Sequence, residues 1–202
     1  MTRIPFEPWP KIPRVNKAMG CVITEKIDGT NAQVHISRSE ESDKDDPDVI
    51  AIQEDDSIPL SMRVGSRSRW ITPESDNYSF ARSVKEKIDT YFALGEGTHF
   101  GEWYGLGIQH GHGMKEKRLA LFNNFRWDNV SRPEGIDVVP TLYRGDYYPE
   151  LINDVATKLK NEGSVLVPGW MKPEGFIVYF PEFRKSAKWT FEAQEGKWKE
   201  TV

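Results

Sequence analysis

The chain has 202 residues, 38% of them apolar and 12% aromatic, which suits one folded domain with its own core. Its single cysteine, Cys21, excludes an intrachain disulfide framework and a cysteine-based zinc site, and we expect it to be a small core residue. The longest apolar run, residues 176–180, is far shorter than the ~20 residues that span a bilayer. The proline-bearing N-terminus has no apolar signal-peptide region, so we expect a cytoplasmic protein without membrane partners.

Charge is unevenly distributed along the chain. The net charge is −4, from 27 basic and 31 acidic residues. Residues 40–56 hold nine acidic residues and one lysine, a local charge of −8, which leaves +4 on the rest. Such a block is typical of a solvated loop. The overall negative charge therefore does not exclude an anionic partner bound elsewhere on the molecule.

The first expected elements are strands. The segment up to Arg14 is rich in proline and is expected to be irregular. Residues 21–24 and 32–36 have strand patterns on either side of a tight turn at Asp28-Gly29. A short strand is expected at residues 62–66, after the acidic block.

The strongest helix pattern covers residues 77–94. Asp76 or Asn77 could cap its start, and Gly95 is expected to end it. Its apolar stripe, which has helical spacing, consists of Phe80, Val84, Ile88 and Tyr91.

The later elements complete one mixed domain. In chain order we expect strands at 98–104, 118–127 and 138–143, a helix at 148–159, and strands at 176–180 and 188–191. No internal repeat or linker interrupts this order, which predicts a single α+β domain over residues 1–202.

A lysine at a strand end carries the clearest chemical signal. Lys26 lies in the run Glu25-Lys26-Ile27-Asp28-Gly29-Thr30-Asn31, beside the tight turn. Taken alone, such a motif is typical of a hairpin turn with an exposed lysine. Other segments follow it in order: Glu102 within a strand, an aromatic residue in 119–123, Glu174 at a further strand, and a basic cluster in 184–189.

This ordered set resembles the nucleotidyltransferase motifs of ATP-dependent polynucleotide ligases and mRNA capping enzymes. It is most similar to small RNA ligases of the RNA ligase 2 family. Further matches lie in residues 65–69, 76–80 and 107–109, and the resemblance extends over about residues 20–192. It implies a fold of antiparallel sheets flanked by helices, with ATP in a cleft between them. It also implies a minimal ligase domain without a C-terminal OB-fold, acting as a monomer on RNA strand ends, or on DNA or hybrid strands.

The resemblance implies a reaction in which Lys26 attacks the α-phosphorus of ATP and forms a lysyl-AMP phosphoramidate. A free lysine, with a pKa of ~10.4, is almost fully protonated at neutral pH, so neighbouring cations must favour its neutral form. Lys185, Lys188 and bound Mg²⁺ or Mn²⁺ are the expected sources of positive charge. These cations would also stabilise the transition state.

The resemblance implies further roles at the nucleotide site. Glu102 and Glu174 would hold the ribose hydroxyls or the hydrated metal ion, which carboxylates suit. Phe122 would stack on the adenine, with Phe125 as the competing residue. Glu25, Lys26 and Ile27 would all contact the nucleotide, and Glu25 would read the exocyclic amine of the adenine.

The resemblance also assigns residues to the strand that is joined. Arg67 would hold the ribose or the 5′-phosphate, with Arg69 as its alternative, and Asn31 would contact the phosphate backbone. The last motif departs from the ligase pattern, because Lys185 and Lys188 are separated by two residues and cannot share one face of a regular strand. Lys188 is therefore the better candidate.

Three other functions share these motifs: a minimal DNA ligase, a capping guanylyltransferase, and a non-catalytic nucleotide- or RNA-binding protein. Outside the motifs, His110 and His112 alternate like a pair of metal ligands. They lie in a glycine-rich loop without a third ligand, so a substrate-facing loop is the favoured interpretation.

Overall fold

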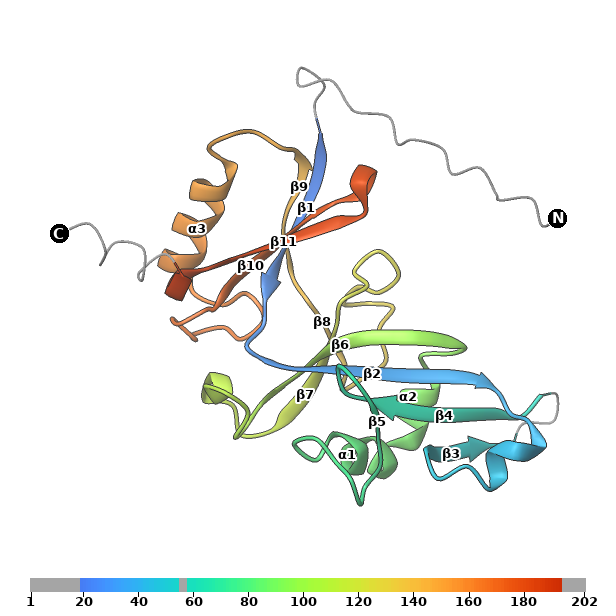
Figure 1. The fold of residues 1–202 in the computed structure, drawn as a ribbon. Helices are drawn as coiled ribbons and strands as arrows, with labels where there is room; N and C mark the ends of the chain where they lie inside the picture. The colour runs from blue at the N-terminus through green and yellow to red at the C-terminus, as the bar shows by residue number, and fades with distance from the viewer. Residues whose placement is uncertain (1–18, 55–57, 194–202) are drawn as a thin grey trace, which may run out of the picture.

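The computed structural model of the protein describes residues 19–54 and 58–193, which form two sheets with helices on their outer sides (Figure 1). The predicted α+β class is confirmed. The proline-rich segment before Arg14 lies outside the described residues. In the described part of the chain, no helix combines the length and apolar character needed to cross a membrane.

The smaller sheet, sheet A, has four antiparallel strands in the order β11-β10-β1-β9. In that order their bounds are Lys185–Thr190, Gly175–Phe180, Gly20–Lys26 and Thr141–Asp146. Helix α3, Leu151–Glu162, lies beside this sheet in Figure 1.

The larger sheet, sheet B, has the order β3-β4-β2-β6-β7-β8, with β5 paired to β4. These strands are β2 (Gly29–Arg38), β3 (Val49–Gln53), β4 (Leu60–Gly65), β5 (Trp70–Ile71), β6 (Gly97–Gly105), β7 (Lys117–Leu121) and β8 (Asp137–Val138). All pairs are antiparallel except β7 with β8. The helical segments on this side are α1 (Phe80–Glu86), α2 (Ile88–Phe92) and the short 3-10 turns η1 (Glu41–Lys44) and η2 (Gly111–Gly113).

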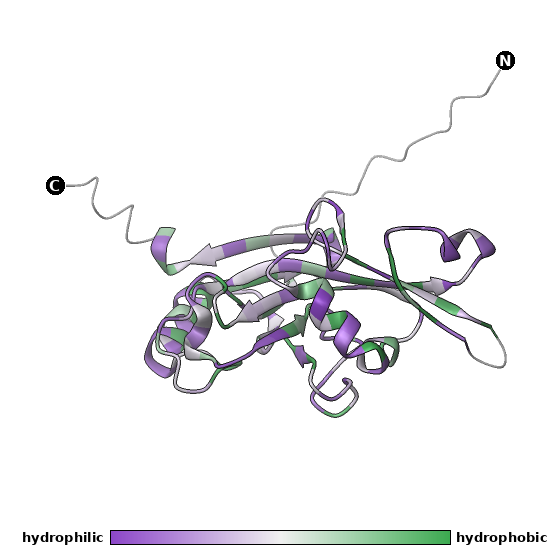
Figure 2. Cartoon of the chain, turned by 90° about the horizontal axis from the view of Figure 1, so that it is seen from below, coloured by the Kyte–Doolittle hydropathy of each residue, from purple (hydrophilic) through white to green (hydrophobic). Residues whose placement is uncertain are grey.

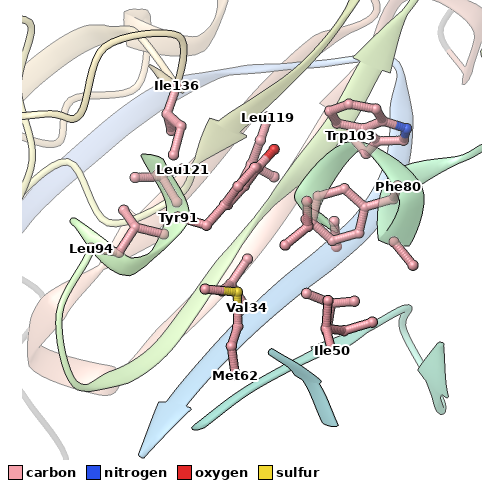
Figure 3. Close-up of a cluster of buried hydrophobic side chains, with 14 of the residues drawn as sticks. Val34, Ile50, Met62, Phe80, Tyr91, Leu94, Trp103, Leu119, Leu121 and Ile136 are labelled. Carbon is pink, nitrogen blue, oxygen red and sulfur yellow. The ribbon is translucent and has the colours of Figure 1, made fainter. Parts of the chain in front are cut away.

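The main core lies between sheet B and the helices α1 and α2 (Figure 3). Phe80 and Trp103 meet there with ring centroids 5.1 Å apart, and both are almost fully buried. The predicted apolar stripe of this region does face the core, since Val84 and Tyr91 are buried and Ile88 packs against the cluster.

A second core joins sheet A to α3. Phe176 of β10 stacks on Trp189 of β11 with centroids 4.9 Å apart, and Cys21 is buried here, as expected for a small core residue. Figure 2 shows hydrophilic and hydrophobic residues interspersed along the strands. Along β2, buried and partly exposed residues alternate, so one face of this strand packs on the core of sheet B and the other stays open.

A third, smaller cluster packs where the two sheets meet. Ile27, Tyr104, Ala120 and Val139 are its buried residues. Because Ile27 connects β1 to β2, this cluster fixes the end of β1 against sheet B.

The helix expected over residues 77–94 is wrong in extent. The chain forms two short helices, α1 and α2, separated by Lys87, whose φ of −127° and ψ of 41° are not helical. Tyr78 and Ser79 adopt positive φ before α1. Ser79 is the N-cap residue of α1, but the Asp76 carboxylate accepts hydrogen bonds from the backbone N–H groups of Ala81 and Arg82 and so satisfies the first turn.

Several expected strands also differ in extent. The strand expected at 118–127 ends at Leu121, because the Asn123 side chain accepts the N–H groups of Phe125 and Arg126 and turns the chain. The strand expected at 138–143 is divided between β8 in sheet B and β9 in sheet A, on either side of Pro140. The helix expected at 148–159 begins later, at Leu151.

The acidic block is not simply a solvated loop. It forms η1 and β3, and the Arg63 guanidinium lies 2.6 Å from an Asp43 oxygen and 2.7 Å from an Asp46 oxygen. Hydrogen bonds from Arg63, Ser61 and the Glu40 backbone lower the pKa of Asp43 to about 2. The non-local partner Arg63 therefore holds this segment against sheet B.

Candidate active site between the two sheets

Lys26 is the last residue of β1, at the point where the chain passes from sheet A to sheet B. Its Nζ atom lies 2.5 Å from Oε2 of Glu174, and the two side chains are 24% and 28% exposed. The register explains this pair, because Lys26 is opposite Gly175, the residue that follows Glu174. Residues separated by 148 positions in the sequence are thus joined by one strand pairing.

Glu102 brings a second carboxylate to the same place from sheet B. It is paired in register with Asn31, whose Nδ2 donates a hydrogen bond to Glu102 Oε2 at 3.1 Å. Glu102 is only 8% exposed, and this burial raises its pKa to about 7; Lys26 opposes the shift, whereas the nearby Glu174 adds to it. Glu102 is therefore about half protonated near neutral pH.

A cavity of about 550 Å³ opens beside these side chains. Both sheets contribute to its wall, which consists of Val22, Thr24, Glu25, Lys26, Ile27, Asn31, Glu102, Phe122, Asn124, Phe125, Val139, Ile177, Tyr179 and Ser186. Its size and its mainly apolar lining, with a few convergent polar groups, are typical of a small-molecule site.

Two exposed aromatic side chains border the cavity. Phe122, directly after β7, is 40% exposed, and Phe125 is 61% exposed. The Arg144 guanidinium lies over the Phe125 ring, 4.3 Å from its centroid. Both phenylalanines therefore line the cavity with exposed side chains, and Arg144 covers one face of the Phe125 ring.

Glu25 points its carboxylate toward a loop. Its Oε2 accepts hydrogen bonds from the backbone N–H groups of Val165 and Leu166, at 2.9 and 3.0 Å. Burial raises the pKa of Glu25 despite these hydrogen bonds and one from Ser164. The side chain thus ties β1 to the loop after α3, while the residue also lines the cavity; its contact with adenine stays a prediction.

The two late lysines lie on opposite faces of sheet A. Lys188 is opposite Ile177, which lines the cavity, whereas Lys185 is opposite Phe180, which packs toward α3. Because side chains alternate along a strand, Lys188 shares the cavity face and Lys185 does not. This agrees with the prediction from their spacing. Ser186, a cavity residue that the sequence did not single out, lies on the Lys188 face.

The two candidate arginines differ in their partners. Arg69 donates hydrogen bonds to the Trp70 carbonyl and to both the carbonyl and the hydroxyl of Ser75, so it braces its own loop. Arg67 is exposed and has no hydrogen-bond or ion-pair partner within residues 19–54 and 58–193. It does not line the cavity. Of the two, Arg67 is the one left available to a ligand.

The structure also brings together residues that the sequence did not connect. His110 Nδ1 lies 2.5 Å from Oδ2 of Asp28, two residues after Lys26. His112, in contrast, is buried and packs between Tyr104 and Trp170. His110 is exposed beside Asp28 and His112 is buried, so the two histidines do not form a pair of ligands for one metal ion. The only sequence feature that pointed to the contact between His110 and Asp28 was the position of Asp28, two residues after Lys26.

A match to a protein-family model shows which family the chain belongs to. The model of the RNA ligase family, described as "RNA ligase", matches residues 20–190. The chain belongs to the RNA ligase family. The match covers both sheets and all the side chains of the site described above.

A solved RNA ligase shares the fold of this chain. A mutant of Naegleria gruberi RNA ligase with AMP and Mn has a TM-score of 0.50 at 18% identity, over 90% of this chain and 52% of that one. An apo mutant of a Naegleria gruberi RNA ligase gives 0.49 at 18% identity, covering 90% and 52%. A mutant with ATP and Mn gives 0.47 at 20% identity, covering 92% and 53%. The chain spans about half the length of these structures, and no curated protein matches it significantly.

The carboxylates of the site suit a hard divalent metal ion. Within the described residues, no three His, Cys, Asp or Glu side chains converge. The charge of the nearby Glu174 adds to the raised pKa of Glu102, so the two carboxylates face the same site. A pair of carboxylates fits a hard ion such as Mg²⁺ or Mn²⁺ that takes its other ligands from water and substrate phosphates.

Proposed function

We propose that this protein is an ATP-dependent RNA ligase that joins a 5′-phosphate end to a 3′-hydroxyl end through a lysyl-AMP intermediate on Lys26. One observation carries the proposal: in a chain of the RNA ligase family, Lys26 lies in a cavity between the two sheets, 2.5 Å from Glu174. The size of that cavity, about 550 Å³, suits a nucleotide.

In the first step, the Lys26 Nζ lone pair forms a bond to the α-phosphorus of ATP, and the bond from that phosphorus to the leaving pyrophosphate breaks. The amine must first lose a proton, and Glu174 Oε2 is the nearest acceptor. Lys188, on the cavity face of β11, is placed to offset the negative charge that develops on the phosphate oxygens.

The rest of the cavity suits the nucleoside. Phe122 and Phe125 offer faces for adenine stacking, and Glu102 offers a carboxylate to the ribose hydroxyls. Asn31 donates a hydrogen bond to Glu102, so it would orient this carboxylate as well as contact the RNA strand.

A divalent ion, Mg²⁺ or Mn²⁺, would be held by Glu102 and Glu174 and would supply positive charge to the phosphates. The presence of Mn in the solved mutant of Naegleria gruberi RNA ligase with AMP supports a divalent ion at such a site.

In the next steps, the 5′-phosphate of an RNA strand takes AMP from Lys26, and a 3′-hydroxyl then attacks that phosphate and releases AMP. Arg67 is exposed and has no partner in the described part of the chain, so it is our candidate for contact with a phosphate of this RNA strand. A single-domain organisation over residues 1–202, a monomeric state and a cytoplasmic location remain predictions.

The test uses purified protein, ATP labelled on the α-phosphate, Mg²⁺ and a 5′-phosphorylated RNA. We expect a covalent label on the protein that survives denaturation and alkali but is released by hot acid, as a P–N bond requires, together with its transfer to RNA and a joined product. A matched DNA substrate distinguishes an RNA ligase from a DNA ligase, and labelled GTP distinguishes it from a capping enzyme. If unmutated protein that is free of AMP takes no label, the enzyme proposal is refuted.

A further inference from the structure

The face of sheet B that turns away from α1 and α2 carries two exposed aromatic side chains outside the cavity, Trp70 and Phe100, at the two ends of a line of paired residues. Strand pairing places Trp70 opposite Gly65, Gly65 opposite Gln33, and Gln33 opposite Phe100. Directly opposed residues of antiparallel strands share a face. We call this line, Trp70, Gly65, Gln33 and Phe100, the aromatic row.

The aromatic row leads to the cavity. The Phe122 N–H donates to the Phe100 carbonyl at 2.9 Å, so Phe122, a cavity residue, extends the row by one position. Asn31 and Glu102 of the cavity form the next pair along the same two strands, on the same face. A smaller cavity of about 220 Å³ borders both Phe100 and Phe122. A strand end held at the active site would therefore run onto the aromatic row.

The exposure of the row is not explained by the fold. Phe100 is 56% exposed and Trp70 36%, whereas Val34 and Trp103, on the other face of the same sheet, are almost fully buried in the core. The solvated face of an antiparallel sheet is normally polar. Large apolar side chains gathered on such a face mark a binding surface.

The chemistry of the row favours nucleobases. It contains no charged side chain, and Gln33 offers an amide between the two exposed rings. Gly65 has no side chain, so no group projects from the sheet between Trp70 and Gln33. A Cβ atom at this position would lie 2.5 Å from the Gln33 amide nitrogen. Unpaired bases stack on exposed aromatic side chains of a sheet, about two or three bases for each sheet.

A cation for the sugar-phosphate backbone lies at the end of the row. Arg67 is exposed in the turn between β4 and β5, three residues before Trp70, and has no partner among the residues described. The next basic residue on this face, Arg63, is already paired with Asp43 and Asp46. The row thus combines stacking faces with one available phosphate contact.

We infer that the aromatic row binds the unpaired nucleotides next to the RNA end that is being joined, with bases stacked on Phe100 and Trp70. The inference rests on the proposed function and deepens it. Because bases inside a duplex cannot stack on protein side chains, the protein should prefer single-stranded ends over nicks in a duplex.

The test measures the affinity of the full chain for a fluorescent 5′-phosphorylated RNA without ATP, as a single strand and as a duplex. We expect the single strand to bind about tenfold more tightly. Phe100→Leu and Trp70→Leu should each weaken single-strand binding by about tenfold, because an aliphatic residue removes the stacking face. Phe183→Leu, which changes another exposed phenylalanine outside the row, should have no effect.

Lysyl-AMP formation needs no RNA and reports whether each variant is folded. Equal binding of single strand and duplex, or unchanged binding by Phe100→Leu, would overturn the inference. So would a loss of lysyl-AMP in Phe100→Leu equal to its loss of RNA binding. If the unmutated protein forms no lysyl-AMP, the ligase proposal fails, and the affinities still decide whether the row binds unpaired RNA.

Discussion

The two sheets contribute different halves of one site. Sheet A supplies Lys26, its ion-pair partner Glu174 and Lys188, all at least partly open to solvent. Sheet B supplies Glu102, which is buried and held by an amide rather than by a cation of its own. Glu102 is therefore about half protonated near pH 7, whereas Glu174 faces the Lys26 ammonium 2.5 Å away. Neither sheet holds a complete site, so the chemistry depends on how they pack together.

The largest expected effect comes from the core that supports sheet B. Trp103 is 2% exposed, packs on Phe80 and donates its indole N–H to the Tyr78 carbonyl. Trp103→Ala should lower the free energy of unfolding by about 3–5 kcal/mol. Phe176→Ala in the core of sheet A is the matched variant, and urea unfolding measures both. If one of them melts its own sheet and leaves the other folded, the sheets are separate units rather than one cooperative structure.

The next effect concerns the ion pair of sheet A. Glu174→Gln keeps the shape of the side chain but removes the negative charge that faces Lys26. We expect lysyl-AMP formation to slow by about 100-fold, a loss typical of removing one preorganised group from a catalytic site. Glu162→Gln, at the exposed end of α3, is the control. A rate within twofold of the unmutated protein would remove Glu174 from the mechanism.

The buried carboxyl of sheet B predicts a pH dependence. The folded-state pKa of Glu102 is about 7, above its ordinary value, so the folded state binds the proton more tightly than the unfolded state. Stability from this group is present at low pH and is lost as pH rises from about 4.5 to 7, by roughly 2–3 kcal/mol. Glu102→Gln should therefore gain stability relative to the unmutated protein over this range. Parallel pH profiles of unfolding for the two proteins would contradict the assignment.

The smallest effect is expected far from the site. Arg63→Ala leaves Asp43 and Asp46 without their cation and should cost about 1–3 kcal/mol of stability at neutral pH. The sign is opposite to that of Glu102, because the low pKa of Asp43 stabilises the fold at neutral pH and this contribution is lost as pH falls toward 2. Thermal unfolding at pH 7 and pH 3 measures the difference between Arg63→Ala and the unmutated protein, which should shrink at the lower pH. Lysyl-AMP formation should stay unchanged.

Local patterns in the sequence were sufficient for much of the fold. Strand alternation and the Asp28-Gly29 turn placed Lys26 at the end of a strand, and the apolar stripe around Phe80 and Val84 does face the core. Helix continuity could not be predicted, because helical spacing of apolar residues persists through a break such as the one at Lys87. The end of β7 depends on an asparagine turn that follows a strand-like sequence.

Motif order and the family resemblance predicted that Lys26, Glu102 and Glu174 share a site. In the structure Lys26 and Glu102 line one cavity, and Glu174 lies 2.5 Å from Lys26. The contacts that no sequence pattern predicted all join residues that are distant in the sequence. Arg63 with the acidic block, His110 with Asp28, and Arg144 over Phe125 each depend on packing between distant segments. The aromatic row is visible only through strand register.

The most direct test of the central claim is to locate the AMP on the polypeptide. The protein is incubated with ATP and Mg²⁺, digested, and mapped by mass spectrometry, with Lys26→Arg and Lys185→Ala treated in parallel. We predict one AMP on the peptide that contains Lys26, none in Lys26→Arg, and normal labelling in Lys185→Ala, whose side chain lies on the other face of sheet A. AMP on any other lysine, or labelling that persists in Lys26→Arg, would contradict the account.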